Sequence, residues 1–367
     1  MKQGSQLNHS IKKTSIIDAN YLFIDGLSRS GKVSIAPVIS SLKRVEHFKA
    51  RASFDRFIMM YESGNLSKQG FKYLFESDLL IDIWFGMMGR DVNNNLHDLS
   101  SIMNSPRREE YIARTNRKDT PDTFNEIVKE IKDQKLIFPF VCDDFVTSGT
   151  LLNEISQTFK YIVVMRNPID MVFAWFRSGR GTRLGTDPRY IKPAFKIKEF
   201  DNLYYSMLDN ADEYNKANPL EKCFLIIEKQ MIRYMNADLL RSDNSCLVPI
   251  ENYWIETEKY IKKFEIFLNT NRTEFTSEEM VRANLPRKID IDTFSKKTNM
   301  IFDNLSEKYV GRLKDLCQRY EFEISDVYKL NSITRSSKDK FKGLSIDAFS
   351  KISSTSKYHK GKLNSKK

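Results

Sequence analysis

The chain has 367 residues, 41% of them apolar and 12% aromatic, so it can bury a sizeable core and is not a disordered protein. Glycine (14) and proline (10) are sparse, which disfavours a many-turned all-β fold and long flexible linkers. The net charge of +11 suggests a nucleic-acid partner, but residues 335–367 hold nine Lys and one Arg against two Asp. They account for +8 of the charge, and we expect no nucleic-acid partner.

The two ends of the chain have the composition of unstructured segments. Residues 1–18 are polar, and 331–367 are rich in Lys and Ser, so we expect a loose arm and a disordered basic tail. No apolar window approaches the ~20 residues of a membrane span, and no secretory leader is evident, so we expect a cytoplasmic protein without a transmembrane segment. The cysteines are scattered and predict neither a metal site nor a disulfide framework: Cys142, Cys223, Cys246 and Cys317.

The middle of the chain alternates predicted strands and helices. Short apolar runs predict buried strands at 21–24, 45–48, 136–141, 161–165 and 246–250. Helical spacing or start signals predict helices at 33–42, 71–88, 123–133, 148–159, 199–215, 220–240, 257–268 and 305–320, with another opened by a capping box at 276–279. This order predicts one α/β domain at 19–330, a three-layer αβα P-loop fold with a mostly parallel sheet and a helical insertion at about 50–135.

A glycine loop follows the first predicted strand. Gly26-Leu-Ser-Arg-Ser-Gly31-Lys32 matches GxxxxGK between a strand and a helix. Backbone N–H groups of such a loop point into one concavity, and the helix N-terminus adds positive charge, so the segment predicts a phosphate site. The alternative is a tight turn without a ligand.

The residue after the lysine separates two classes of phosphate loop. Nucleotide hydrolases and kinases place a Ser or Thr there to hold Mg²⁺, and this chain has Val33. Ser34 would point about 100° away on the helix. A magnesium-dependent enzyme is therefore disfavoured.

Arg29-Ser30-Gly31 resembles the core of the 5′-phosphosulfate loop of sulfotransferases that use 3′-phosphoadenylyl sulfate (PAPS). The resemblance covers about residues 20–320 and implies PAPS as the donor and no catalytic metal. It implies that Arg29 neutralises charge on the leaving phosphate and the sulfuryl group. The 5′-phosphosulfate would be held by Ser30, Gly31, Lys32, Val33 and Ser34, although the family has two hydroxyl residues where this chain has Lys32 and Val33.

A second motif supports the same family. Arg166-Asn-Pro-Ile-Asp170 follows the clearest strand and resembles the RNPxD start of the family's 3′-phosphate motif, with Asn167 as helix N-cap. An arginine there suits phosphate, since its fork matches phosphate oxygens. The family's later Ser is Ala174 here. Arg287 falls where the family has a basic loop over the 3′-phosphate; a solvated turn is equally compatible.

Sulfuryl transfer to a hydroxyl calls for a general base, usually His or a carboxylate. The family draws it from the segment after the second strand, where this chain has Glu46 and His47, with Asp55 slightly beyond. Asp143 and Asp144 end another strand on the expected ligand side, and Asp143 is a candidate for binding the acceptor. A structural role for each of these side chains is the alternative.

An arginine- and glycine-rich segment follows at 177–189. We predict a mobile cationic loop in which Arg180 and Arg183 bind an anionic acceptor, such as an acidic glycan; a solvated loop is the alternative.

Together these features predict a PAPS-dependent sulfotransferase that acts on a hydroxyl or amine of an unidentified acceptor, with carbohydrate among the candidates. The alternatives are a Mg·ATP-dependent P-loop kinase of small molecules, and a non-catalytic nucleotide- or polyanion-binding protein that uses the basic tail.

Overall fold

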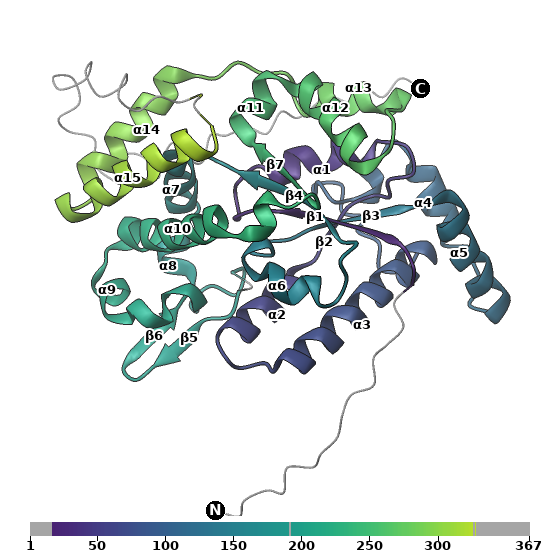
Figure 1. Cartoon of the computed structure of the whole chain (residues 1–367), viewed down its shortest axis with the longest axis horizontal. Helices are drawn as coiled ribbons and strands as arrows, with labels where there is room; N and C mark the ends of the chain where they lie inside the picture. The colour runs from purple at the N-terminus through teal and green to yellow at the C-terminus, as the bar shows by residue number, and fades with distance from the viewer. Residues whose placement is uncertain (1–16, 191, 326, 328–367) are drawn as a thin grey trace, which may run out of the picture.

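The computed structural model describes residues 17–190, 192–325 and 327 (Figure 1). The predicted arm, except for its last two residues, and the predicted basic tail lie outside the described residues.

Five parallel strands form the central sheet. They are β1 (Asn20–Asp25), β2 (Lys49–Ala50), β3 (Ile137–Val141), β4 (Lys160–Met165) and β7 (Ser245–Pro249). Their order is β2-β3-β1-β4-β7, with β1 in the centre, and Phe23 stands level with Phe140 on one side and Tyr161 on the other. Nearly every residue of β1, β3 and β4 is buried, as the apolar runs predict for a sheet covered on both faces.

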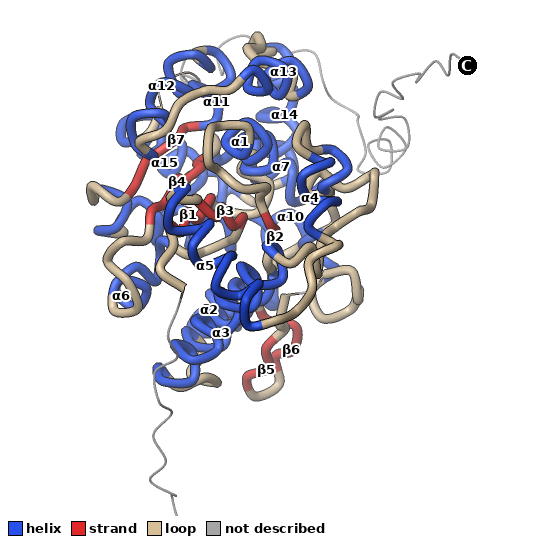
Figure 2. The backbone as a smooth tube through the Cα atoms, turned by 90° about the vertical axis from the view of Figure 1, so that its right-hand side faces the viewer, coloured by secondary structure: helices blue, strands red, loops and turns tan. Residues whose placement is uncertain are grey.

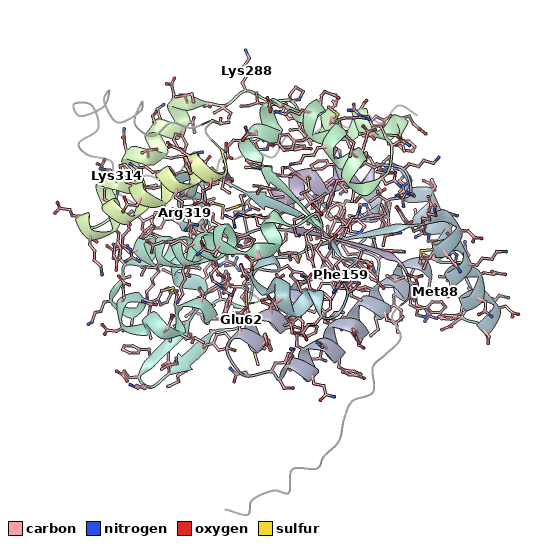
Figure 3. The ribbon with its side chains drawn as sticks, in the orientation of Figure 1. Glu62, Met88, Phe159, Lys288, Lys314 and Arg319 are labelled. Carbon is pink, nitrogen blue, oxygen red and sulfur yellow. The ribbon has the colours of Figure 1, made fainter. Side chains whose placement is uncertain are left out.

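Alternate residues of the strands supply two separate cores. Phe23 lies on one face, where its ring packs against Phe140, Tyr161 and Phe159, which is labelled in Figure 3. Leu22 and Ile24 lie on the other face. The Phe23 face is covered by α2 (Ala52–Glu62), α3 (Lys68–Met87), α7 (Pro168–Arg177), α10 (Pro219–Asn236) and α15 (Glu307–Glu323). The opposite face is covered by α1 (Lys32–Ser40), α11 (Ile250–Ile255), α12 (Thr257–Leu268) and α13 (Glu274–Arg282).

The fold is therefore the three-layer α/β arrangement that the sequence predicts, with helices on both sides of a parallel sheet (Figures 1 and 2). The segment between β2 and β3 is helical as predicted and consists of α2, α3, a 3₁₀ turn, α4 (Arg108–Arg114) and α5 (Pro121–Gln134). No helix in the part of the chain that the structure describes is long and apolar enough to cross a bilayer.

Several predicted elements are wrong in place or kind. The helix predicted at 199–215 is a hairpin of β5 (Phe195–Ile197) and β6 (Phe200–Leu203), followed by a 3₁₀ turn (Tyr205–Asn210) and the short helix α9 (Ala211–Lys216). In β5, the polar Lys196 stands between Phe195 and Ile197, which is the alternation of a strand, whereas Phe200 and Leu203 in β6 are three residues apart, a spacing that also fits a helix. The strand predicted at 45–48 begins only at Lys49, and Val45 forms an isolated bridge to Ile137.

Other boundaries also differ. The helix predicted at 148–159 shrinks to a 3₁₀ turn at Val146–Ser148 and α6 (Gly149–Asn153). The capping box predicted at 276–279 starts three residues earlier, because Thr273 is the N-cap of α13 and pairs with Thr276. A helix that the sequence analysis missed, α14 (Ile291–Asn304), precedes α15.

Candidate functional site

Three central strands end at the same edge of the sheet. β1 leads into the glycine loop. Its two neighbours in the sheet are β3, which leads into Asp143, and β4, which leads into Arg166. In open parallel sheets, ligands bind at this carboxyl edge. The chain thus brings most of its predicted site residues to one place: the loop 26–32, Asp143, Arg166, Arg180 and Arg287.

The glycines of the loop are required by close contacts. A Cβ on Gly26, whose φ is 144°, would lie 2.2 Å from the carbonyl oxygen of Val164 in β4. A Cβ on Gly31, whose φ is 108°, would lie 2.7 Å from Ile250. Both positions have the positive φ that glycine adopts without strain, so the GxxxxG spacing sets how closely the loop packs between β4 and α11.

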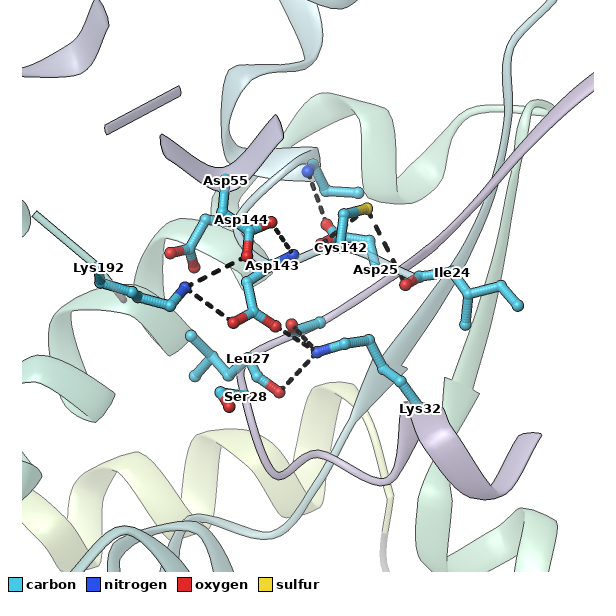
Figure 4. A network of polar contacts seen from close by, with 12 residues as sticks. Ile24, Asp25, Leu27, Ser28, Lys32, Asp55, Cys142, Asp143, Asp144 and Lys192 are labelled. Carbon is cyan, nitrogen blue, oxygen red and sulfur yellow. Dashed lines mark hydrogen bonds and ion pairs between the residues drawn. The ribbon is translucent and has the colours of Figure 1, made fainter. Parts of the chain in front are cut away.

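Lys32 is folded back onto the loop. Its Nζ donates to the carbonyl oxygens of Gly26 and Leu27, and it forms an ion pair with Asp143 at 2.7 Å (Figure 4). The next residue, Val33, is 47% exposed, and Ser34 Oγ donates to the carbonyl of Gly31 at 2.7 Å. Ser30 is 1% exposed, and its Oγ has no hydrogen-bond partner. The loop therefore contains one buried hydroxyl group that no other group of the described residues satisfies.

Asp143 belongs to a buried charge cluster that adjoins the loop. Lys192 Nζ lies 2.8 Å from Asp143 and 3.6 Å from Asp55, and Asp55 accepts a hydrogen bond from the backbone N–H of Asp143 at 2.7 Å (Figure 4). Burial raises the pKa of Asp143, but Lys192 and Lys32 outweigh it and hold that pKa well below its usual range. Burial raises the pKa of Asp55, Lys192 only partly offsets this, and Asp143 raises it further. The carboxyl group of Asp143 is thus kept ionised, and that of Asp55 beside it binds a proton more tightly than an ordinary aspartate.

The sequence analysis missed Lys192. A single lysine before Pro193, in a chain with 59 Lys and Arg, forms no pattern. Burial lowers the pKa of Lys192, but Asp143 and Asp55 raise it far more, so its ammonium stays charged.

A buried network supports this edge from below. The Tyr234 hydroxyl donates to the Asp25 carboxyl group at 3.1 Å and accepts from the backbone N–H of Asp144 at 2.8 Å, while Val146 N–H donates to Asp25 at 2.8 Å. Burial raises the pKa of Asp25 to about 6. The end of β1 and the turn after β3 are therefore held in fixed register beneath the loop.

Two arginines meet on the other side of the loop. The Arg166 guanidinium donates to the carbonyl oxygen of Arg29 at 3.1 Å and lies 5.5 Å from the ring of Trp254, and that of Arg287 lies 4.3 Å from the same ring. Arg166 Nε, Arg287 Nε and Trp254 Nε1 are buried without hydrogen-bond partners. Burial lowers the pKa of Arg287, and the positive charge of Arg166 lowers it further. Two like charges this close, with three unused donors, are groups whose energy an anionic ligand would lower.

The helix after β4 begins as the sequence predicts. Asn167 Oδ1 accepts from the N–H of Ile169 at 2.9 Å, and Pro168 is the first residue of α7. Asp170 pairs with Lys297 and lies 3.6 Å from Arg166, so it fixes the arginine as well as the helix start.

The predicted loop at 177–189 contains a short helix, and part of the segment packs closely against α10. A Cβ on Gly181 would lie 2.0 Å from the carbonyl oxygen of Pro219, which leaves no room between α8 (Arg180–Arg183) and α10. Arg183 pairs with Asp187 at 2.8 Å and donates to the carbonyl of Ser178 at 3.0 Å, so it serves the local structure. Arg180 points the other way, and its Nη2 donates to Ser28 Oγ of the glycine loop at 2.8 Å.

Glu46 and His47 are not brought to the loop. Glu46 N–H donates to Ile137, the first residue of β3, so the pair lies at the amino end of the sheet, whereas the loop leaves the carboxyl end. Arg114 forms two hydrogen bonds with Glu46, at 2.7 and 3.0 Å. Burial raises the pKa of Glu46, but Arg114 outweighs it and lowers that pKa; burial lowers the pKa of His47 to about 4. Both side chains line a separate cavity of about 270 Å³ beside β2.

Within the described ranges, no group of three or more His, Cys, Asp or Glu side chains is placed to hold a metal ion. The four cysteines are all buried as free thiols.

No family model and no curated protein matches the chain. Among solved structures, it resembles a sulfotransferase domain from the curacin biosynthetic pathway (11% identity, TM-score 0.41, 83% of this chain and 99% of that one). It also resembles a sulfotransferase from Alicyclobacillus acidocaldarius (12%, 0.37, 87% and 100%) and the sulfotransferase domain of the Synechococcus PCC 7002 olefin synthase (12%, 0.35, 96% and 98%). Because these similarities are low, we infer the function of this chain from its own residues.

Proposed function

We propose that the protein is a sulfotransferase that takes a sulfuryl group from PAPS and transfers it to a hydroxyl or amine acceptor. The observation that carries this proposal is the pairing of the glycine loop with Arg166, Arg287 and Trp254. A donor with a phosphosulfate at one end and a 3′-phosphate at the other needs two anion sites. The loop supplies the first, and the two arginines, with their unused buried donors, supply the second.

The loop residues have distinct roles in this proposal. Ser30, Gly31, Lys32, Val33 and Ser34 hold the 5′-phosphosulfate, mainly through backbone N–H groups at the start of α1, and the ammonium of Lys32 adds charge. Arg29 stabilises the negative charge that grows on the leaving phosphate.

Asp55 is the general base in this proposal, in place of Glu46 or His47. It lies beside Asp143 in the cluster that adjoins the loop, and its raised pKa gives it the affinity for a proton that a base needs near neutral pH. The acceptor oxygen forms a bond to sulfur, the bond between sulfur and the bridging oxygen of the 5′-phosphate breaks, and the acceptor proton goes to Asp55. Asp143 and Lys192 orient that carboxyl group, and an acceptor bound over Asp143 would lie next to it.

The kinase alternative is less well supported. Asp143 follows β3, where a kinase would need an acid to hold Mg²⁺. Here Asp143 forms ion pairs with both Lys32 and Lys192, and Val33 stands where a kinase needs a hydroxyl. Each departure favours a reaction in which positioning and fixed positive charge replace the metal.

Titration calorimetry in EDTA tests the second anion site. Adenosine 3′,5′-bisphosphate, the product of the donor, should bind at least ~10-fold more tightly than adenosine 5′-monophosphate, because a hydrogen bond to a charged group contributes about 1.5–3 kcal/mol. Arg166→Ala and Arg287→Ala should each remove most of that preference. Lys288→Ala is the matched control, because Lys288 is the exposed neighbour of Arg287 and points away from the domain (Figure 3). Equal binding of the two nucleotides by the unaltered protein would contradict the proposal.

A further inference from the structure

The guanidinium of Arg180 faces the glycine loop and is fixed by contacts with its neighbours. Its guanidinium lies 5.0 Å from the ring of Trp175 and 5.2 Å from that of Tyr190, and Nη2 donates to Ser28 Oγ at 2.8 Å. Its Nε is buried without a partner. No carboxylate among the described residues forms an ion pair with it, although Arg183, one turn away, has Asp187.

The surroundings of Arg180 fix its position. Trp175 is 1% exposed, and its Nε1 donates to the carbonyl oxygen of Ser28 at 2.7 Å, so Ser28 is held at both its carbonyl and its hydroxyl. α8 cannot move toward α10, because Gly181 is in contact with Pro219. The guanidinium is therefore preorganised against the loop, and it does not have to swing in from solvent when a ligand binds.

Arg180 is half-buried, and a partly desolvated cation without a counter-charge is costly, a cost that an anionic ligand lowers. Two other cations beside the loop are already balanced in part: Lys32 by Asp143, and Arg166 by Asp170. Arg180 is thus the cation whose charge the chain leaves open beside Ser28.

The position of Arg180 indicates which part of the donor it meets. Tyr190, which packs on it, stands two residues before Lys192, and Lys192 pairs with Asp143 and Asp55, so Arg180 is on the side of the loop that faces the Asp55 cluster. Arg166 and Arg287 gather instead around Trp254. Transfer has to occur on the side where the base lies.

We propose that Arg180 binds the oxygens of the transferring sulfuryl group and stabilises them as the bond between sulfur and the bridging oxygen breaks. This inference rests on the proposed function, since it assumes a phosphosulfate donor in the loop. It assigns to Arg180 a part in donor chemistry, whereas the sequence analysis assigned it to an anionic acceptor.

The test compares two ligands that differ only in the sulfuryl group. PAPS and adenosine 3′,5′-bisphosphate are titrated into the full-length protein in EDTA, with no acceptor present. Arg180→Gln should weaken PAPS binding ~10-fold or more and bisphosphate binding less than ~3-fold, because only PAPS carries the group that Arg180 contacts. Arg180→Lys should lose less, since it keeps the charge but not the planar fork. Arg177→Gln, which removes an exposed charge three residues earlier, should change neither.

Equal losses for the two ligands would overturn the inference and leave Arg180 as a residue that only shapes the loop. If Arg180→Gln does not fold, the ratio of the two affinities in Arg180→Lys decides, and an unchanged ratio overturns the inference. Failure of the unaltered protein to bind the bisphosphate would overturn the proposed function, and this inference with it.

Discussion

At each end of the sheet an arginine stacks on an aromatic ring, and the two differ in what balances their charge. At the amino end, Arg114 lies 5.0 Å from the ring of Tyr111 and forms two hydrogen bonds with the buried carboxylate of Glu46. At the carboxyl end, Arg287 lies 4.3 Å from Trp254, and its charged neighbour is another arginine, Arg166. The first arginine has a carboxylate of the chain as its partner, whereas no carboxylate among the described residues forms an ion pair with Arg287.

This difference separates a charge that the fold itself balances from one that a ligand would balance in the proposed function. A buried guanidinium with its own carboxylate holds elements together, here α4 and the approach to β2. A guanidinium beside a second cation raises the energy of the empty site, and a bound anion relieves it. Both guanidinium groups stack on an aromatic ring, so stacking alone does not separate the two cases. Arg114 is buried with a carboxylate, whereas Arg287 is half-buried beside another arginine.

The largest effect should come from the proposed base. Asp55→Asn should lower kcat by roughly 10²–10⁴-fold, the usual contribution of a general base, and leave the affinity for adenosine 3′,5′-bisphosphate within ~3-fold of the original. Turnover at saturating PAPS with an excess of acceptor measures the first quantity, and calorimetry the second.

His47→Gln is the control for Asp55→Asn, because it replaces a candidate base at the opposite end of the sheet. Because His47 lies at the amino end, its replacement should leave kcat within ~3-fold of that of the unaltered protein. The pH profile adds a further check: burial raises the pKa of Asp55, so kcat should rise with pH above the range of an ordinary aspartate. A large loss of kcat in His47→Gln with none in Asp55→Asn would contradict the proposal and place the base at the amino end of the sheet.

The next effect concerns stability at the amino end. Glu46→Ala leaves the Arg114 guanidinium buried without its main partner and should lower the free energy of unfolding by about 3 kcal/mol or more. Urea denaturation measures the change. Glu110→Ala is the control, since Glu110 contacts the same arginine but is itself exposed, and it should cost less than about 1 kcal/mol. The affinity for adenosine 3′,5′-bisphosphate should stay unchanged in both variants. A loss of affinity in Glu46→Ala would contradict the view that the amino end of the sheet has only a structural role.

The smallest effect tests a carboxyl group that supports the arginine site. Glu251 accepts from Asn167 N–H and from the Tyr320 hydroxyl, both at 2.8 Å, and burial raises its pKa to about 7. A raised carboxyl pKa stabilises the folded protein below the unfolded value near 4.5, and this contribution is lost as pH rises to about 7.

Glu251→Gln should therefore gain stability relative to the unaltered protein between pH 5 and pH 8, by at most about 3 kcal/mol. Urea unfolding at the two pH values measures the difference. A difference that does not depend on pH would show that Glu251 is ionised at both.

Features that depend on neighbours in sequence were predictable. The GxxxxGK loop, the Asn167 cap of α7 and the two-sided burial of β1 and β4 follow from short patterns, and the structure contains all of them. Features that depend on distant contacts were not. Nothing adjacent to Lys192 predicts its pairing with Asp143. The hairpin at 195–203 was not predicted because part of its sequence has helical spacing.

The role of Glu46 shows the same limit. A Glu–His pair near the second strand fits the pattern of a base, but the strand starts four residues later than predicted, and Arg114, 68 residues away, binds the carboxylate. The sequence places residues along the chain; which end of the sheet they reach depends on register.

The most direct measurement is thermal unfolding of the full chain with adenosine 3′,5′-bisphosphate in EDTA, beside Mg·ATP. A ligand at ~100 times its dissociation constant adds about 2.7 kcal/mol of stability. We expect the bisphosphate to raise Tm without metal, and Arg166→Ala to abolish the shift. Stabilisation by Mg·ATP alone would contradict the sulfotransferase proposal and favour the kinase.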